Sequence, residues 1–209
     1  MVCVQCQPYF TKSFLATMSE FNFDKYNHIL VVDLEATCCD LQTILRHQME
    51  TIEIGAVMID RETLSIVDEF QTFIKPRRHP ILTDFCRQLT SITQAQVDTA
   101  PTFAEAINLW QPWLMQFDRT IFGSWGDYDR KQFQQDSKHH QIDLPYPVSS
   151  NHVNLKEQFS ITQKLNRRYG MAQALNLAGV ELVGTHHRGI DDARNISQLL
   201  PHILGRKAI

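Results

Sequence analysis

The stretch His28–Glu35, HILVVDLE, is an apolar run that ends in two acidic residues. Its first part is rich in branched apolar side chains and predicts a strand buried on both faces. Because alternate side chains of a strand point to one face, Asp33 and Glu35 are expected to lie together at its end. Two such carboxylates repel each other unless a cation lies between them, and oxygen ligands suit Mg²⁺ or Mn²⁺ better than Zn²⁺. The alternative is a strand that simply ends in two solvated acids.

Further strands and helices are expected downstream of this first strand. Strands are expected over 51–60, 64–75, 119–122 and the end of 141–153. Helices are expected to begin after Thr102, near Asp127, at Met171 and near Asp191. Pro112 and Pro201 should bend or end the helices in which they lie. An antiparallel hairpin followed by strands that alternate with helices predicts an α/β domain with a mixed sheet.

The overall composition is that of a globular protein. The chain has 209 residues, of which 43% are hydrophobic, so it can bury a core without disulfide bonds. Twenty basic and 23 acidic side chains give a net charge of −3, which argues against a strongly basic nucleic-acid or membrane-surface protein. No apolar run approaches the roughly 18 residues needed to span a bilayer, so no membrane partner is expected.

The cysteines indicate a reducing environment. There are five of them, an odd number without the regular spacing of a disulfide framework, which favours an intracellular, cytoplasmic location. Cys3 and Cys6 form a C-x-x-C, but no second pair follows, so the pair is interpreted as incidental to a terminal segment rather than as a metal or redox site. We expect residues 1–27 to be an N-terminal extension and 28–209 to form one domain.

Two more groups of chemically capable residues follow the fourth and last predicted strands. Asp127 and Asp129 lie where a helix should begin, and Asp127 is the natural N-cap. His187 precedes Asp191 and Asp192 on the approach to the final helix. Only one of these two aspartates can cap that helix. An imidazole with a pKa near ~6.5 can take a proton from a metal-bound water at neutral pH. These residues therefore extend the acidic pair of the first strand into a candidate catalytic set.

In this order along the chain, the three groups resemble the motifs of the DEDDh family of 3′→5′ exonucleases. The stretches 32–38, 52–57, 83–93 and 187–196 are similar to the subgroup that contains the histone-mRNA 3′ exonuclease and relatives that regulate RNA interference. Arg188 occupies the position at which the tyrosine-type sister group has Tyr, which favours the histidine branch. The resemblance implies a ribonuclease H-like fold over residues 28–209, with a central mixed five-stranded sheet flanked by helices.

The resemblance also implies a catalytic site. It assigns two ions, Mg²⁺ or Mn²⁺, to Asp33, Glu35, Asp129 and Asp192, and the role of general base to His187. Asp127 is a second candidate in the sequence Gly-Asp-Tyr-Asp, but the aromatic–Asp pair favours Asp129. His186 is interpreted as a neighbour of the base.

The implied substrate is the 3′ end of single-stranded nucleic acid, RNA in preference to DNA, with release of 5′-mononucleotides. The backbone of Ala36 and Thr37 resembles the positions that meet the terminal sugar. Phe85, Leu89 and Ile92 are candidates for a stacking or wedge surface, ahead of Trp125. Basic residues at 77–79 and 156–168 either bind phosphates or form solvated faces. No protein partner is indicated.

Two other functions are compatible with the same residues. A DNA-directed 3′→5′ exonuclease would use the same chemistry, because the choice between RNA and DNA depends on contacts to the 2′-hydroxyl. A nucleic-acid-binding module with a decayed site is less favoured, since all five catalytic positions are filled.

Overall fold

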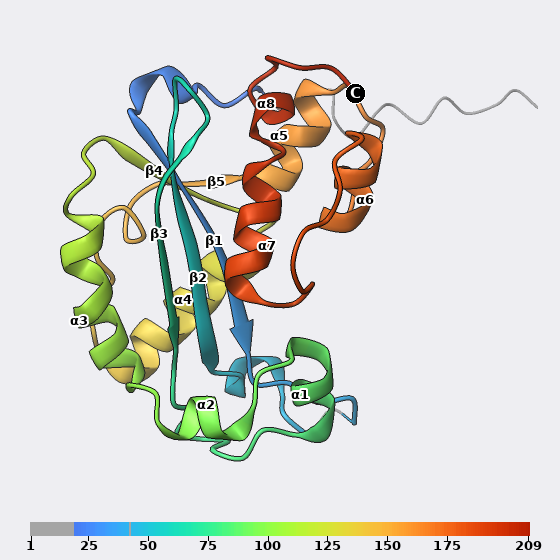
Figure 1. Ribbon diagram of the computed structural model, residues 1–209. Coiled ribbons are helices and arrows are strands. Elements are labelled where there is room, and N and C mark those ends of the chain that lie inside the picture. Colours follow the sequence, from blue (N-terminus) through green and yellow to red (C-terminus); the bar gives the residue numbers. More distant parts are fainter. Residues whose placement is uncertain (1–18, 42) are drawn as a thin grey trace, which may run out of the picture.

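A five-stranded mixed sheet forms the centre of the computed structural model, which describes residues 19–41 and 43–209 (Figure 1). The strands are β1 His28–Ala36, β2 Thr51–Asp60, β3 Ile66–Phe73, β4 Thr120–Ser124 and β5 His152–Asn154. Their order across the sheet is β3-β2-β1-β4-β5. β1 pairs antiparallel with β2 and parallel with β4, so the predicted mixed sheet is confirmed.

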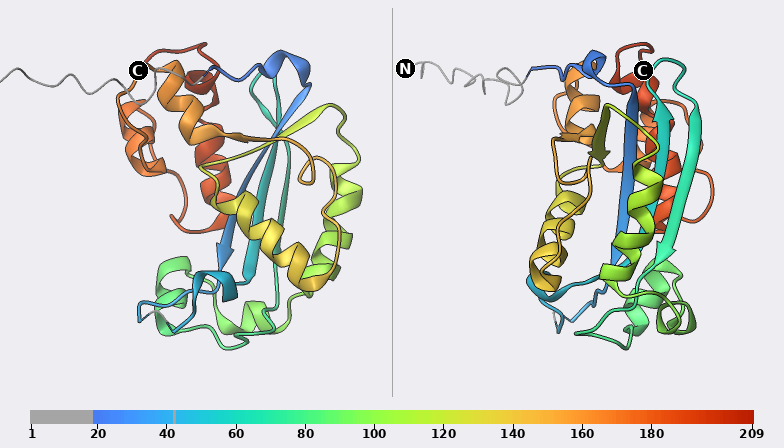
Figure 2. Two further views of the ribbon diagram at one scale, coloured as in Figure 1. Left: turned by 180° about the vertical axis from the view of Figure 1, so that it is seen from behind. Right: turned by 90° about the vertical axis from the view of Figure 1, so that its left-hand side faces the viewer.

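Helices cover both faces of this sheet (Figure 1, Figure 2). They are α1 Asp84–Thr90, α2 Gln94–Asp98, α3 Phe103–Leu114, α4 Tyr128–His140, α5 Leu155–Thr162, α6 Met171–Leu177, α7 Gly189–Ser197 and α8 Leu200–Ile203, with short 3-10 turns η1 Phe23–Lys25 and η2 Arg46–Gln48. Alternate residues of β1 separate the two core layers: Ile29 packs with α5 to α8, and Leu30 packs with α3 and α4. A strand with apolar residues on both faces is the arrangement that the run at 28–32 predicts.

Several element boundaries differ from the sequence predictions. Helices α1 and α5 were not expected, and α7 begins at Gly189 rather than near Asp191. Pro112 lies within α3 and does not end it. Proline removes only the hydrogen bond that its own N–H would donate, and the helix continues past it: the Met115 N–H still donates to the Gln111 carbonyl.

The N-terminal part of helix α7 lies directly on strand β2. A Cβ atom at Gly55 would stand 2.0 Å from the carbonyl carbon of Gly189, so only a glycine permits this approach. Glu53, also on β2 and fully buried, accepts hydrogen bonds from Arg188 Nε and from the Gly189 backbone N–H, both at 3.1 Å. This anchor holds the beginning of α7 beside the end of β1.

The residues just before β1 pack onto the same body. Phe23 is buried in the core layer beneath α5 to α8, and the Phe21 N–H donates to Gln158 Oε1. No helix in the described ranges 19–41 and 43–209 has the length and apolar character needed to cross a membrane. Cys3 and Cys6 lie outside the described residues.

Candidate active site

Acidic side chains from three separate elements meet at the end of β1. Carboxylate oxygens of Asp33, Glu35 and Asp192 lie within 4.8 Å of one another. Asp129, in the first turn of α4, joins them because its Oδ1 accepts a hydrogen bond of 3.0 Å from the backbone N–H of Leu34. The four acidic residues singled out in the sequence are therefore brought together.

These carboxylates line one wall of a pocket of about 330 Å³. The pocket is lined by Asp33, Leu34, Glu35, Ala36, Cys38, Met49, Leu89, Trp125, Tyr128, Asp129, Met171, His186, His187 and Asp192. One wall is thus acidic, and much of the rest is apolar or aromatic. Such a combination suits a ligand that has both a charged group and a flat apolar one.

Burial and mutual repulsion make the acidic wall costly to ionise. Desolvation, followed by the charges of the neighbouring carboxylates, raises the pKa of Asp33 well above its usual range. The same two causes raise the pKa of Glu35 to about 9. Desolvation raises the pKa of Asp129 to about 6, although the Leu34 N–H opposes the shift. Without a neighbouring positive charge, Glu35 therefore stays protonated at neutral pH, and a bound cation would be needed to hold the carboxyl groups of this wall in their ionised form.

The described side chains supply little of that charge. Within residues 19–41 and 43–209, no lysine or arginine forms an ion pair with the four carboxylates, and the guanidinium of Arg188 pairs with Glu53 instead. Only His186 reaches one of them, Asp192. An all-carboxylate donor set with unbalanced negative charge fits a hard divalent cation.

Two histidines cover Asp192. The Nδ1 atom of His186 lies 3.1 and 3.0 Å from its two carboxylate oxygens, and the backbone N–H of His187 donates to Oδ2 at 3.0 Å. The two imidazoles stack with their centroids 4.0 Å apart. Desolvation, with the neighbouring His186, lowers the pKa of His187, so its ring is neutral and able to accept a proton at pH 7. His186 contacts the carboxylate more directly than the sequence indicated.

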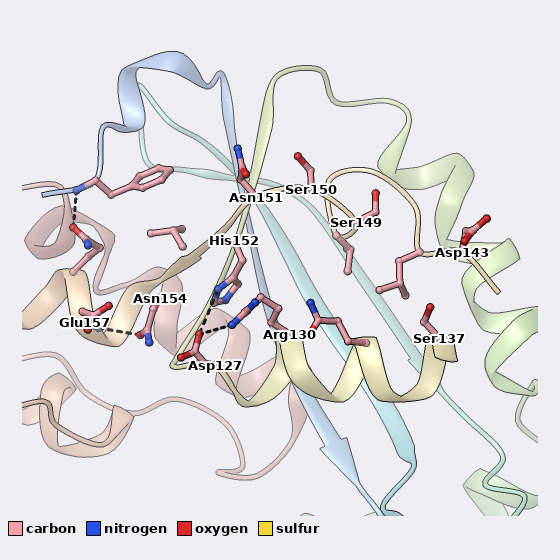
Figure 3. A pocket seen from close by; sticks show the side chains of 16 residues that line it. Asp127, Arg130, Ser137, Asp143, Ser149, Ser150, Asn151, His152, Asn154 and Glu157 are labelled. Carbon is pink, nitrogen blue, oxygen red and sulfur yellow. Dashed lines mark hydrogen bonds and ion pairs between the residues drawn. The ribbon is translucent and has the colours of Figure 1, made fainter. Parts of the chain in front are cut away.

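Asp127 faces away from this site. It occupies the N-cap position of α4 but makes no capping hydrogen bond, so the capping prediction for its side chain is wrong. Its carboxylate instead lies 3.4 Å from Arg130 Nη2 and 3.9 Å from His152 Nδ1 (Figure 3). The ion pair with Arg130 draws Asp127 outward, which leaves Asp129 as the acid of α4 that faces β1.

The pocket into which Asp127 points is larger, at about 640 Å³, but lacks the features of a catalytic site (Figure 3). Two of its three acidic residues pair with basic ones, Asp127 with Arg130 and Glu157 with Arg168, and the third is Asp143. Burial lowers the pKa of His152 to about 4, which keeps that imidazole neutral. The smaller pocket, where unpaired carboxylates converge, is therefore the better candidate for chemistry.

The predicted substrate contacts are only partly available. Ala36 and Leu89 line the candidate pocket, whereas Phe85 is 37% exposed and lies outside its lining. Ile92 is fully buried with Ile52, so the prediction of a substrate contact there is wrong: the side chain fills the core beneath α1 and α2. Thr37 is also buried, and its backbone N–H already donates to Glu50 O.

Several lining residues were not proposed from the sequence. Tyr128 immediately precedes Asp129, and an aromatic residue at that position was noted only as an alignment guide. Met49 and Met171 come from a loop and a distant helix, and no periodicity marks them as neighbours of the carboxylates. Trp125, which the sequence favoured less than Phe85, Leu89 and Ile92 as a substrate contact, does line the pocket.

The chain belongs to a known exonuclease family: the model of the RNase T exonuclease family matches residues 30–200. It is similar to ERI1 exoribonuclease 3 of Mus musculus, 30% identical over 195 residues, which cover 89% of this chain and 56% of that protein. The chain thus spans about half the length of that relative.

Solved structures agree with this assignment. The nuclease domain of 3′hExo, described as a DEDDh family member bound to rAMP, superposes with a TM-score of 0.77 at 27% identity, covering 88% of this chain and 92% of that one. A 3′-exonuclease described in 3′-end specific recognition of histone mRNA stem-loop gives a TM-score of 0.79 at 26% identity, over 87% and 64% of the two chains. The ribonuclease H-like fold and the DEDDh resemblance are confirmed.

Proposed function

We propose that this protein is a divalent-metal-dependent 3′→5′ exonuclease that acts on single-stranded RNA and releases 5′-mononucleotides. The convergence of Asp33, Glu35, Asp129 and Asp192 beside two histidines carries the proposal, because no described basic side chain other than His186 pairs with them. The relatives named as exoribonucleases, and the one bound to rAMP, favour RNA over DNA.

Asp33, Glu35, Asp129 and Asp192 are the residues that would hold the metal, and we propose two Mg²⁺ or Mn²⁺ ions. Bound divalent cations supply charge stabilisation at the phosphate and a more acidic water. The rest of the chemistry belongs to the side chains of the chain itself. The neutral ring of His187 accepts the proton of the attacking water, and the contact of Asp192 with the His187 N–H fixes the loop that carries it.

The remaining pocket walls orient the terminal nucleotide. Leu89 and Tyr128 offer apolar and aromatic surface for a base, and the end of β1 at Ala36 lies beside the carboxylates, where the sugar would be held. An unpaired 3′ end fits this arrangement because a base in a duplex would have to leave its partner first. We further propose that residues 28–209 form the catalytic domain and that the protein works in a reducing, intracellular compartment.

The direct test uses 5′-labelled single-stranded RNA and DNA of one sequence, incubated with Mg²⁺, Mn²⁺ or EDTA. We expect a metal-dependent ladder that shortens from a free 3′ end, faster on RNA. Asp33→Asn should abolish cleavage, and His187→Ala should lower the rate by roughly 10²-fold or more while metal binding persists. A folded wild-type protein that binds RNA but cleaves neither polymer with any metal would favour the nucleic-acid-binding module instead.

A further inference from the structure

Among the residues that the structure describes, Arg46, beside the active site, and its neighbour Arg78 both lack an acidic partner. Arg61, Arg87, Arg130, Arg168, Arg188 and Arg194 each pair with a carboxylate. Within the described part of the chain, Arg46 and Arg78 form no such ion pair, and both are exposed. Their positive charge is therefore available to a ligand.

Arg46 extends the wall of the active-site pocket. Its guanidinium carbon lies 4.3 Å from the ring centroid of Tyr128, which lines that pocket, and its Nη1 donates to Gln132 Oε1 at 2.6 Å. The Met49 carbonyl accepts hydrogen bonds from Gln132 and Gln135, at 3.0 and 2.7 Å. The loop that carries Arg46 is thus fixed to helix α4, so the guanidinium is held in place before any ligand binds.

Arg78 continues the same surface away from the pocket. Its Nη1 donates to the carbonyl of His47, the residue after Arg46, at 3.1 Å, and its Nε lies 2.9 Å from His139 Nε2. Buried Glu50 accepts the backbone N–H groups of Arg77, Arg78 and His79, at 2.9, 2.7 and 3.1 Å. Because these N–H groups satisfy the carboxylate, Glu50 holds the loop without engaging the Arg78 side chain.

A metal site is a weaker explanation of this region. Ligand atoms of Glu50, His139 and His140 do lie within 4.8 Å of one another. However, the Glu50 oxygens are already used by three backbone donors, and the guanidinium of Arg78 beside His139 would repel a cation. The surface suits an anion better.

We infer that Arg46, His47, Arg78 and His139 form a track that binds the phosphates of single-stranded RNA on the 5′ side of the terminal nucleotide. The inference rests on the proposed function, since it assumes that the 3′ end lies in the pocket lined by Tyr128. From there the RNA leaves over the Arg46 loop and past the end of α4. Guanidinium groups bind phosphate oxygens through paired N–H donors, without base specificity.

Substrate length separates the track from the catalytic site. For Arg46→Gln/Arg78→Gln, kcat/KM on a long single-stranded oligonucleotide should fall roughly tenfold through KM. Arg78→Gln alone, which changes no residue in contact with the pocket, should also weaken the long substrate but leave cleavage of a dinucleotide unchanged. The dependence of log KM on log salt for the long substrate should become shallower by about 0.7 for each phosphate that is no longer neutralised.

Two further variants serve as controls. Arg46→Lys/Arg78→Lys keeps both charges and should retain most of the salt dependence. Arg61→Gln, at the β2–β3 turn, removes one charge elsewhere and should behave as wild type.

A binding measurement makes the result independent of catalysis. Fluorescence anisotropy in EDTA with a long RNA that ends in a 3′-phosphate should show the same loss of affinity in the double Gln variant, and none in Arg61→Gln. Equal losses on long and short substrates, or unchanged binding and salt dependence, would overturn the track. If the wild type bound this RNA through the two arginines but cleaved nothing, the proposed function would fail while the track remained.

Discussion

At Gly55, the missing side chain lets helix α7 lie against β2, and this contact places Asp192 beside Asp33 and Glu35. A methyl group there would overlap the backbone of Gly189. We expect Gly55→Ala to destabilise the fold by about 3 kcal/mol, since neither strand nor helix backbone can yield easily. Urea denaturation provides the measurement, and nuclease activity should fall with it because α7 is displaced.

Gly170 offers a matched control. It caps α6 with φ −61°, and the nearest atom to an added Cβ is 4.0 Å away, at Gln173. Gly170→Ala should therefore change the unfolding free energy by no more than about 1 kcal/mol. Equal effects of the two substitutions would contradict the close approach of α7 and β2.

Single residues also show what the sequence alone can predict at the site. Asp33 and Glu35 follow from the alternation of one strand, and Asp129 and Asp192 from motif order. Ile92 was misassigned because the sequence of a motif does not distinguish an apolar residue that contacts a ligand from one that packs in the core. Only the packing of α1 and α2 against β2 settles that question, and it places Ile92 inside.

Among the elements, α3 shows how local chemistry fixes a boundary. Thr102 and Glu105 form a capping box, in which the Glu105 carboxylate accepts from the Thr102 N–H at 2.8 Å and from its hydroxyl at 2.7 Å. The hydrogen bond from the Thr102 N–H lowers the pKa of Glu105, and the bond from the Thr102 hydroxyl adds a smaller effect in the same direction. A carboxylate with a depressed folded-state pKa stabilises the fold above its unfolded pKa, and this contribution disappears as the pH falls.

Glu105→Gln should therefore lower stability at about pH 7 and have a much smaller effect at about pH 3, where the carboxyl group is protonated. Urea denaturation at the two pH values checks this. The capping box of α2 closes with an uncharged residue, Gln96, so Gln96→Ala should have the same effect at both pH values. If Glu105→Gln lowered the unfolding free energy more at acidic pH than at neutral pH, the charge of Glu105 would not be what stabilises the cap.

The helices that the sequence missed are short and depend on tertiary contacts. α5 spans eight residues, and its buried Leu155 and Phe159 pack beneath the sheet. Isolated helices of this length are unstable, so their formation is decided by distant partners rather than by their own periodicity. By contrast, β2 spans 51–60 as predicted, because a continuous apolar run specifies a buried strand locally.

At the scale of the whole molecule, the fold holds mutually repelling carboxylates together. The sheet and two helices place Asp33, Asp129 and Asp192 next to one another from positions far apart in the chain. Their mutual repulsion lowers the stability of the fold, and a bound cation would relieve it. The phosphate track has the same long-range origin: it joins the loop of Arg46 to that of Arg78 through Glu50. No local pattern connects those loops, so the sequence alone does not predict that they meet.

This arrangement predicts how the metal-free protein responds to pH. Carboxyl groups with raised folded-state pKa values stabilise the fold while protonated and lose that contribution as the pH rises. In EDTA, the melting temperature should therefore fall as the pH rises through about 6, for Asp129, and about 9, for Glu35. Mg²⁺ or Mn²⁺ should restore most of the lost stability at the alkaline end of this pH range.

A mutational test separates the carboxylate repulsion from other effects of pH. Asp33→Asn should raise the metal-free melting temperature and reduce the response to metal, whereas exposed Asp118→Asn should do neither. A metal-free protein that became more stable towards pH 9 would show that the carboxylates do not repel one another as the structure indicates.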